Sequence, residues 1–230
     1  MKQEILTRIF QDREDKQPVA LVTRMADGRQ ALIYKDRSLF GELPLSAQEQ
    51  ERAQQMLHSG RSGKLPESDD SLFVRSYVPL YRLVIVGAVH IAQKLAPIAK
   101  EVGYQVSVVD PRRAFATQER FPGVELICEW PDEALEKLQL DSQTALVTLT
   151  HDPKIDDPAI IEALKSNVFY IGCLGSTRTH ARRVERLTEE GFADALHRIH
   201  APVGLDLGGR SPAEVAVATL AQIIQARYTR

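Results

Sequence analysis

The chain has 230 residues, 43% of them hydrophobic, and a formal net charge of −2 at pH 7. This length allows one complete hydrophobic core and a small accessory unit, and the lack of a basic excess argues against nucleic acid and anionic membrane surfaces as partners. The first residues have no apolar core of signal-peptide length and no window approaches a membrane span, so we expect a cytoplasmic protein without membrane contact.

Residues 1–80 predict a small α+β subdomain. Two half-alternating apolar runs are separated by Ala26-Asp27-Gly28-Arg29, which is typical of a β-hairpin. Ser46, followed by Glu49 three residues later, is typical of a helix start, because each side chain can bond the other residue's amide. The predicted elements are strands at 18–25 and 30–34, a helix at 46–58, a polar linker at 60–70 and an extended segment at 72–78.

Residues 83–113 have the pattern of a βαβ unit that opens a nucleotide-binding domain. Leu83 to Val86 is a continuous apolar run, as in a buried parallel strand, and Gly87 follows it as a turn residue. Apolar residues at helical spacing continue to Gly103, where the helix ends. Asp110 closes the second strand about twenty residues after the first glycine, where an acid meets a ribose hydroxyl in dinucleotide-binding folds.

The dinucleotide fingerprint of this unit is incomplete. Its three glycine positions read Gly87, Val89 and Ala92, and the middle glycine normally lets the backbone approach a pyrophosphate. A β-branched valine obstructs that approach, so ordinary NAD(P) binding is not the expected function. A structural Rossmann unit with an empty crevice stays open as an alternative.

Strands and helices alternate through residues 81–230, which predicts a Rossmann-like domain. Such alternation favours parallel strands joined by right-handed crossovers, in a doubly wound, three-layer αβα sandwich. The predicted strands lie at 83–87, 105–109, 124–128, 144–149 and 168–172, and the helices at 89–102, 131–138, 158–166, 178–190 and 212–227. Ligands of this architecture bind outside the carboxyl ends of the strands, so the loops of interest are 87–90, 110–113, 150–157 and 172–179.

Residues 170–180 leave a strand through two glycines and enter a helix with hydroxyls at its start. Free amides and the helix dipole favour an anion at such a terminus, and positive or donor groups lie nearby at Arg178, His180, Arg182 and Arg183. Simple capping by Ser176 or Thr177 is the alternative. The later arginines alternate with glutamates, so several of them are expected on a solvated and paired helix face instead.

The loop 148–158 contains one histidine and three aspartates. These acids lack the spacing of a calcium loop, and Asp157-Pro158 is typical of a helix start with the acid as cap, so capping competes with a metal site. His151 follows a strand and can donate to a bound oxyanion or be an ordinary loop histidine.

Two further features concern the cysteines and the last loop. Cys128 and Cys173 end separate strands without the spacing of a zinc site or a disulfide framework. Cys173 is either a cofactor-handling thiol or a small buried one. The glycines of 200–210 either let the backbone approach a ligand or serve the turn alone, and Ser211 with Glu214 then forms a predicted capping box.

Five segments carry a family pattern in chain order. They are GAVHIAQ at 87–93, VVDPRRAFATQERFP at 108–122, LTHDPKIDDPAI at 149–160, YIGCLGSTRTHARR at 170–183 and IHAPVGLDLGGRSPAEVAVATLAQI at 199–223. Together they resemble the xanthine dehydrogenase accessory family, XdhC/CoxI. This resemblance implies a Rossmann-like carboxy-terminal domain at 81–230. It also implies an accessory protein that binds the molybdenum cofactor and delivers it, sulfurated, to a xanthine dehydrogenase or carbon monoxide dehydrogenase type of enzyme.

A candidate cofactor site follows from this resemblance together with the loops, and it includes no catalytic residue and no metal ligand. Molybdopterin carries a phosphate and its dinucleotide form a pyrophosphate, which suits anion sites. The candidate residues are Gly87, Ala88, His90, Asp110, Arg112, Arg113, His151, Gly172, Cys173, Gly175, Ser176, Arg178, Thr179 and His180.

The expected partner is a molybdoenzyme of the xanthine dehydrogenase family. A cofactor sulfurase or nucleotidyltransferase is a further candidate, and a homodimer is the expected assembly. An NAD(P)-dependent oxidoreductase and a nucleotide-sensing module are the alternatives, although no proton-transfer pair is evident at usable spacing.

The amino-terminal half departs from the family pattern. Longer members have a GG-C-[VL]-E type segment there, with a cysteine implicated in cofactor handling. Residues 1–80 contain no equivalent, which puts cysteine ligation of the cofactor in doubt.

Overall fold

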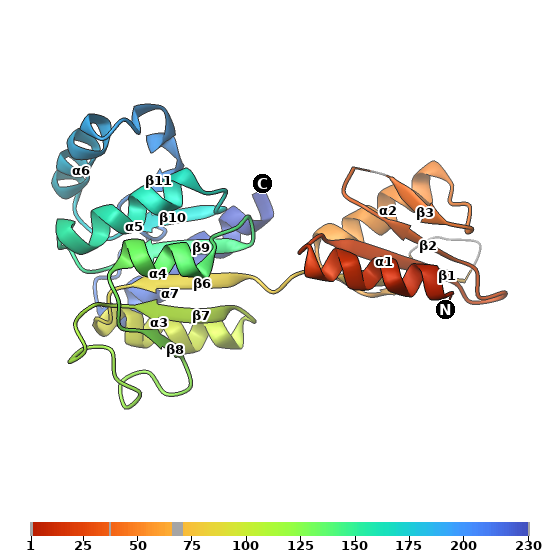
Figure 1. Cartoon of the computed structure of the whole chain (residues 1–230), viewed down its shortest axis with the longest axis horizontal. Coiled ribbons are helices and arrows are strands. Elements are labelled where there is room, and N and C mark those ends of the chain that lie inside the picture. The colour runs from red at the N-terminus through yellow and green to blue at the C-terminus, as the bar shows by residue number, and fades with distance from the viewer. Residues whose placement is uncertain (1, 37, 66–70, 230) are drawn as a thin grey trace. The chain divides into compact units, whose positions relative to one another are not determined.

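The computed structural model describes residues 2–36, 38–65 and 71–229, and the chain divides into two compact units, Met1–Pro79 and Leu80–Arg230 (Figure 1). The first unit is built on an antiparallel sheet with the order β3-β2-β1-β5-β4. Its elements are α1 (Gln3–Glu14), β1 (Val19–Arg24), β2 (Gln30–Ile33), β3 (Leu39–Gly41), α2 (Ala47–His58), β4 (Gly63–Lys64) and β5 (Leu72–Tyr77).

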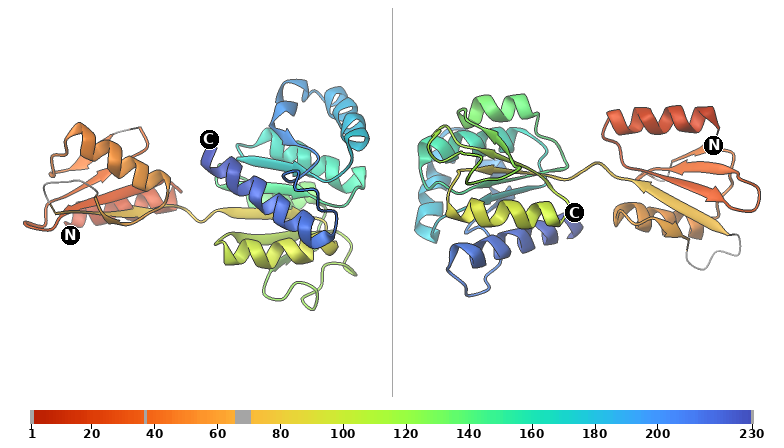
Figure 2. Two further views of the ribbon diagram at one scale, coloured as in Figure 1. Left: turned by 180° about the vertical axis from the view of Figure 1, so that it is seen from behind. Right: turned by 90° about the horizontal axis from the view of Figure 1, so that it is seen from below.

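The two helices of this unit cover opposite faces of its sheet (Figure 2, right). Successive side chains of a strand point to opposite faces, so one strand can serve both layers. Ala20 and Val22 of β1 pack in the cluster on the α2 side, and Val19 and Leu21 pack in the cluster on the α1 side.

Several predictions for the first unit are confirmed. β1 and β2 form the hairpin, with Leu21 opposite Leu32, and Ser46 and Glu49 form the capping box of α2. The sequence did not predict α1, β3 or β4. Part of the predicted linker, at 66–70, lies outside the described residues, and the described part before it contains β4.

The second unit is a Rossmann-like fold, as predicted. Its six-stranded sheet has the order β11-β10-β9-β6-β7-β8, and each neighbouring pair of strands is parallel. The elements are β6 (Arg82–Val86), α3 (His90–Glu101), β7 (Gln105–Val109), β8 (Glu125–Ile127), α4 (Pro131–Leu138), β9 (Thr144–Thr148), α5 (Pro153–Lys165), β10 (Tyr170–Cys173), α6 (Thr177–Glu189), the 3-10 helix η1 (Ala193–Arg198), β11 (Ile199–His200) and α7 (Pro212–Thr229).

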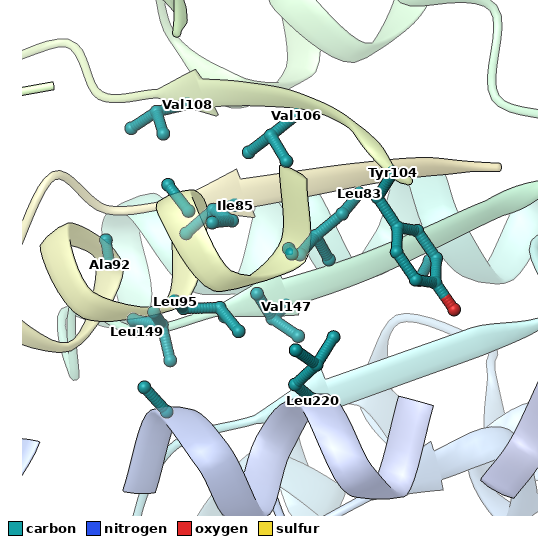
Figure 3. Close-up of a cluster of buried hydrophobic side chains, with 14 of the residues drawn as sticks. Leu83, Ile85, Ala92, Leu95, Tyr104, Val106, Val108, Val147, Leu149 and Leu220 are labelled. Carbon is teal, nitrogen blue, oxygen red and sulfur yellow. The ribbon is translucent and has the colours of Figure 1, made fainter. Parts of the chain in front are cut away.

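Helices cover both faces of this sheet (Figures 1 and 2). α3 and α7 contribute to the hydrophobic cluster on one face, and α4, α5 and α6 contribute to the cluster on the other. Figure 3 shows the first cluster, where Leu95 of α3 and Leu220 of α7 lie against Ile85 and Val147 of the sheet. No described helix combines the length and apolar character needed to cross a bilayer.

The predicted start of α5 was wrong. The helix begins at Pro153 with Asp152 as its cap, and Pro158 lies inside it. The segment 150–158 contains two Asp-Pro pairs, and the structure uses the earlier one as the helix start. This earlier start buries Ile155 and places the Asp156 carboxylate where it bonds the amides of the preceding loop.

We expect Leu95→Ala to destabilise the second unit by about 2–5 kcal/mol, because Leu95 is fully buried between α3 and the sheet and its loss leaves a cavity. Chemical denaturation measures this change. Lys94→Ala, an exposed neighbour on the same helix, should change stability by less than about 0.5 kcal/mol. Equal effects of the two substitutions would contradict the packing described here.

Candidate functional site

The strand order of the second unit reverses between β6 and β9, which are neighbours in the sheet although β7 and β8 lie between them in the chain. Ligands of open α/β folds bind outside the carboxyl ends of the strands at such a switch point. The loops at this edge form two halves. We call 87–89 with 110–113 the β6–β7 half, and 149–152 with 174–176 the β9–β10 half.

Asp110 is the central residue of the β6–β7 half. Its Oδ2 accepts the Ala88 amide at 2.8 Å and Arg112 Nη2 at 2.8 Å, and its Oδ1 accepts the Arg112 amide at 3.0 Å and Nε at 2.9 Å. Burial raises the pKa of Asp110, but the hydrogen bonds from Arg112 and Ala88 outweigh burial and hold the pKa below its ordinary value. The carboxylate therefore stays ionised at neutral pH.

This arrangement leaves Asp110 no free acceptor position for the predicted ribose contact. A carboxylate accepts about four hydrogen bonds, and Asp110 already accepts four while being 0% exposed. Its role is to position other groups. It fixes the loop after β6 and orients Arg112, whose side chain is 36% exposed and whose guanidinium lies 4.6 Å from the centre of the Phe115 ring. Arg113 and His90 are exposed.

In the loop after β6, the backbone amide of Ala88 is not available to a ligand. Ala88 is 0% exposed and its amide is bonded to Asp110, so this amide is not free for the predicted cofactor contact. Gly87 has a φ of +108°, and a Cβ there would lie 2.6 Å from Thr150 Cγ2, so this glycine permits close packing of two loops. Val89 is the N-cap of α3 and provides no side-chain cap, which leaves the first-turn amides of α3 for another acceptor.

In the β9–β10 half, the loop after β9 is stabilised by Asp156. This carboxylate is 1% exposed and accepts Thr150 Oγ1 at 2.7 Å and the His151 amide at 3.1 Å. Burial raises the pKa of Asp156, and the bonds from Thr150 and the charge of Arg183 oppose that rise. His151 itself is exposed with a φ of +65°. Among the described residues, no group of three or more His, Cys, Asp or Glu is placed to hold a metal ion.

The start of α6 is capped by its own hydroxyl. Ser176 Oγ accepts the Thr179 amide at 3.2 Å and lies 3.0 Å from Thr179 Oγ1. Gly175 has a φ of +139°, and a Cβ there would meet the Thr179 side chain at 3.0 Å. Capping by Ser176 is therefore present. The cap is neutral and does not cancel the positive end of the helix dipole, next to which Arg178 is exposed.

Two predicted ligand contacts at the end of β10 are buried in the structure. Cys173 is 0% exposed, and burial raises the pKa of its thiol to about 11 even though Arg183 favours the thiolate. The thiol is therefore protonated and inaccessible, which does not suit cofactor handling. Gly172 is also buried, and a Cβ there would lie 2.7 Å from Val203 Cγ2, so the loop after β11 requires this glycine.

Sequence reasoning missed the buried position of Arg183. It is 2% exposed, donates from Nη2 to the Leu174 carbonyl at 3.1 Å, and lies 3.9 Å from the Asp156 carboxylate. Arg183 is therefore not one of the arginines on the solvated face of α6. Arg183 precedes the fully buried Leu187 by four residues, and that spacing alone could have placed it on the inner face.

The family profile described as the XdhC Rossmann domain matches residues 83–223, which include both halves of the carboxyl edge. The chain belongs to the XdhC family. The chain is 34% identical over 200 residues to a probable xanthine dehydrogenase subunit of Bacillus subtilis (strain 168), covering 85% of this chain and 57% of that protein.

A second relative of this XdhC protein is the molybdenum cofactor insertion chaperone PaoD of Escherichia coli (strain K12). It is 31% identical over 156 residues, covering 67% of this chain and 43% of PaoD. The chain thus spans about half the length of these curated relatives. A solved xanthine dehydrogenase structure from Bacillus halodurans has a TM-score of 0.70 and 24% identity, covering 99% of this chain and 65% of that one, which supports the fold.

We expect Asp110→Asn to lower the free energy of unfolding by about 1–3 kcal/mol at pH 7, because a buried, charge-assisted network loses its anion. The pKa of Asp110 is lower in the folded state than the unfolded value of about 3.9, so its contribution is present above that pH and is lost as the pH falls through the folded pKa. Denaturation across this range should show the two proteins converging in acid. Glu119→Gln, at an exposed acid, should show no such convergence, and a constant difference between Asp110→Asn and the wild type would contradict the ionised carboxylate.

Proposed function

We propose that this protein is a molybdenum cofactor accessory protein, which binds the cofactor and passes it in sulfurated form to a molybdoenzyme of the xanthine dehydrogenase type. Membership of the XdhC family is the observation that carries this proposal, and the similarity to PaoD, named as an insertion chaperone for the same cofactor, supports it. The name of the Bacillus subtilis relative supports a xanthine dehydrogenase type of partner.

The chemistry of the carboxyl edge fits a phosphorylated ligand. The helices α3 to α7 begin there, and helix N-termini favour anions. α4 and α7 have acidic residues in their first turns, which disfavours an anion at these two helices. Asp152 caps α5 with a negative charge, which disfavours an anion at that helix. The starts of α3 and α6 carry no acidic cap, so these two are the candidates.

We assign the phosphate of the pterin to the start of α6. Gly175, Ser176, Arg178 and Thr179 lie at this start, and the exposed Arg178 adds a charge that α3 lacks in its first turn. When bound, the cofactor supplies the molybdenum chemistry that the client enzyme needs. This chain supplies the phosphate contacts, and Arg112 with Phe115 supplies a flat, cationic surface at the opposite half of the edge.

Assembly with other proteins is part of the same proposal. A homodimer, and contacts with a cofactor sulfurase or nucleotidyltransferase, would serve an accessory protein that receives its cofactor before handing it on. Cys173 is buried, so this chain does not offer an accessible thiol at β10 for that transfer. The mono- or dinucleotide form of the cofactor would be identified by mass spectrometry of the released pterin.

The first test compares two arginines of α6. Arg178→Ala should weaken binding of a pterin phosphate about tenfold to a hundredfold, since a charge-assisted hydrogen bond contributes roughly 1.5–3 kcal/mol. The matched control is Arg182→Ala, which removes an exposed arginine one turn further from the helix start. The pterin affinity of both variants is measured by calorimetry on protein from a host that makes molybdopterin, together with pterin fluorescence after oxidation. Equal affinity of the wild type and a folded Arg178→Ala protein for the pterin would show that the phosphate does not bind at the start of α6.

A nicotinamide-dependent or nucleotide-sensing module is the second candidate, favoured by the uncapped start of α3 and the Rossmann strand order. We expect NAD to bind weakly and without hydride transfer, because Val89 occupies the middle glycine position and Asp110 holds the Ala88 amide.

Replacing the valine tests this expectation. Val89→Gly should bind NAD more tightly than the wild type, whereas Val102→Gly, at the other end of α3, should not. Calorimetric titration with NAD measures the difference. Tight NAD binding by the wild type, accompanied by substrate-dependent reduction, would favour the oxidoreductase instead.

A further inference from the structure

A group of buried polar atoms without hydrogen-bond partners lies beneath the β9–β10 half. Three buried side-chain nitrogen atoms there have no such partner among the described residues, namely His180 Nδ1 and the Nε and Nη1 atoms of Arg183. Buried polar groups in native proteins are nearly always paired with protein, water or ligand. Three such atoms on one face of α6 therefore point to a missing polar group.

Arg183 carries a buried positive charge that its surroundings compensate only weakly. Its one hydrogen bond to the described residues goes to the Leu174 carbonyl, and the nearest carboxylate, Asp156, is 3.9 Å away. Asp156 is already bonded by Thr150 and His151, and burial raises its pKa. A buried charge with so little compensation is unfavourable, and an anion beside it would relieve the cost.

The guanidinium is aimed at the start of its own helix. Side chains of a helix point toward its N-terminus, and Arg183 reaches back to Leu174, directly before the turn at Gly175 and Ser176. His180 lies on the same face, and burial together with the charge of Arg183 lowers its pKa, so the imidazole is neutral at pH 7. The helix dipole, the neutral Ser176 cap and the free guanidinium donors thus converge on one loop.

We propose that Arg183 is the counter-ion of a phosphate group bound at 174–177, and that the Leu174 carbonyl occupies the place of that phosphate when no ligand is present. On binding, the guanidinium gives up the Leu174 carbonyl and donates to phosphate oxygens. Because Arg183 is 2% exposed, the loop 174–176 must move outward as the phosphate enters. The identification of the ligand as a pterin phosphate rests on the proposed function, whereas the anion site rests on the unpaired atoms.

The test uses Arg183→Met, which keeps most of the length of the side chain and removes its charge. The substitution also leaves the buried Asp156 carboxylate without its cation, so the ligand-free variant should melt below the wild-type temperature, and phosphate binding is the deciding measurement. Inorganic phosphate and pyrophosphate, added at constant ionic strength, should raise the melting temperature of the wild type and of Arg182→Ala. They should bind Arg183→Met about tenfold or more weakly.

Two results would overturn the proposal. One is equal phosphate binding by wild type and Arg183→Met. The other is the absence of any phosphate effect on the melting temperature of the wild type, as expected if Arg183 only braces the loop. If Arg183→Met does not fold, the Arg183 Nε–H resonance of the wild type gives the answer, since phosphate must shift it if the anion binds there.

The same proteins separate this inference from the proposed function. Phosphate binding that depends on Arg183, without any pterin in protein from a molybdopterin-producing host, would retain the anion site and reject the cofactor role. Normal pterin binding by Arg183→Met would retain the cofactor role and reject the anion site.

Discussion

The buried carboxylate of Asp110 is the constraint on which the carboxyl edge depends. It joins the end of β7 to the loop after β6 and sets the direction of Arg112, so it determines what both loops can present. In a dinucleotide-binding domain the corresponding acid faces the ligand. Here it faces the protein, because the arginine two residues later and the Ala88 amide use all of its acceptor positions. The Rossmann framework is kept while its usual ribose contact is lost.

The two halves of the edge consequently differ in how fully their polar groups are satisfied. In the β6–β7 half the charge of Asp110 is matched by Arg112 at 2.8 Å. In the β9–β10 half Asp156 and Arg183 are 3.9 Å apart. Two nitrogen atoms of Arg183, Nε and Nη1, have no hydrogen-bond acceptor among the described residues. A saturated network resists change, whereas an unsatisfied one gains free energy from a new partner. Ligand-dependent change should therefore concentrate in the β9–β10 half.

Local sequence patterns predicted most of the second unit. Continuous apolar runs identify β6 and β9, and Ser211 with Glu214 forms a capping box at the start of α7. α1 escaped prediction because it is largely polar, with Ile5 and Ile9 as its only buried apolar residues. The site was harder to predict. The position of Asp110 follows from strand spacing, but its saturation depends on the rotamer of Arg112. The spacing of Arg183 from Leu187 indicates the inner face of α6, but the partners of Arg183, Leu174 and Asp156, depend on the tertiary fold.

The side-chain amide of Gln222 links the last helix to the rim of the sheet. Its Oε1 accepts the Tyr170 hydroxyl at 2.5 Å and the Gly204 amide at 2.9 Å, so a single oxygen connects β10, α7 and the loop after β11. Gly204 also packs so tightly on α7 that a Cβ there would lie 3.1 Å from Ala218. The beginning of the glycine-rich loop after β11 is therefore held rigidly on α7. We expect this attachment to limit movement of the loops in the β9–β10 half, so that any opening of the carboxyl edge occurs on the side of α6.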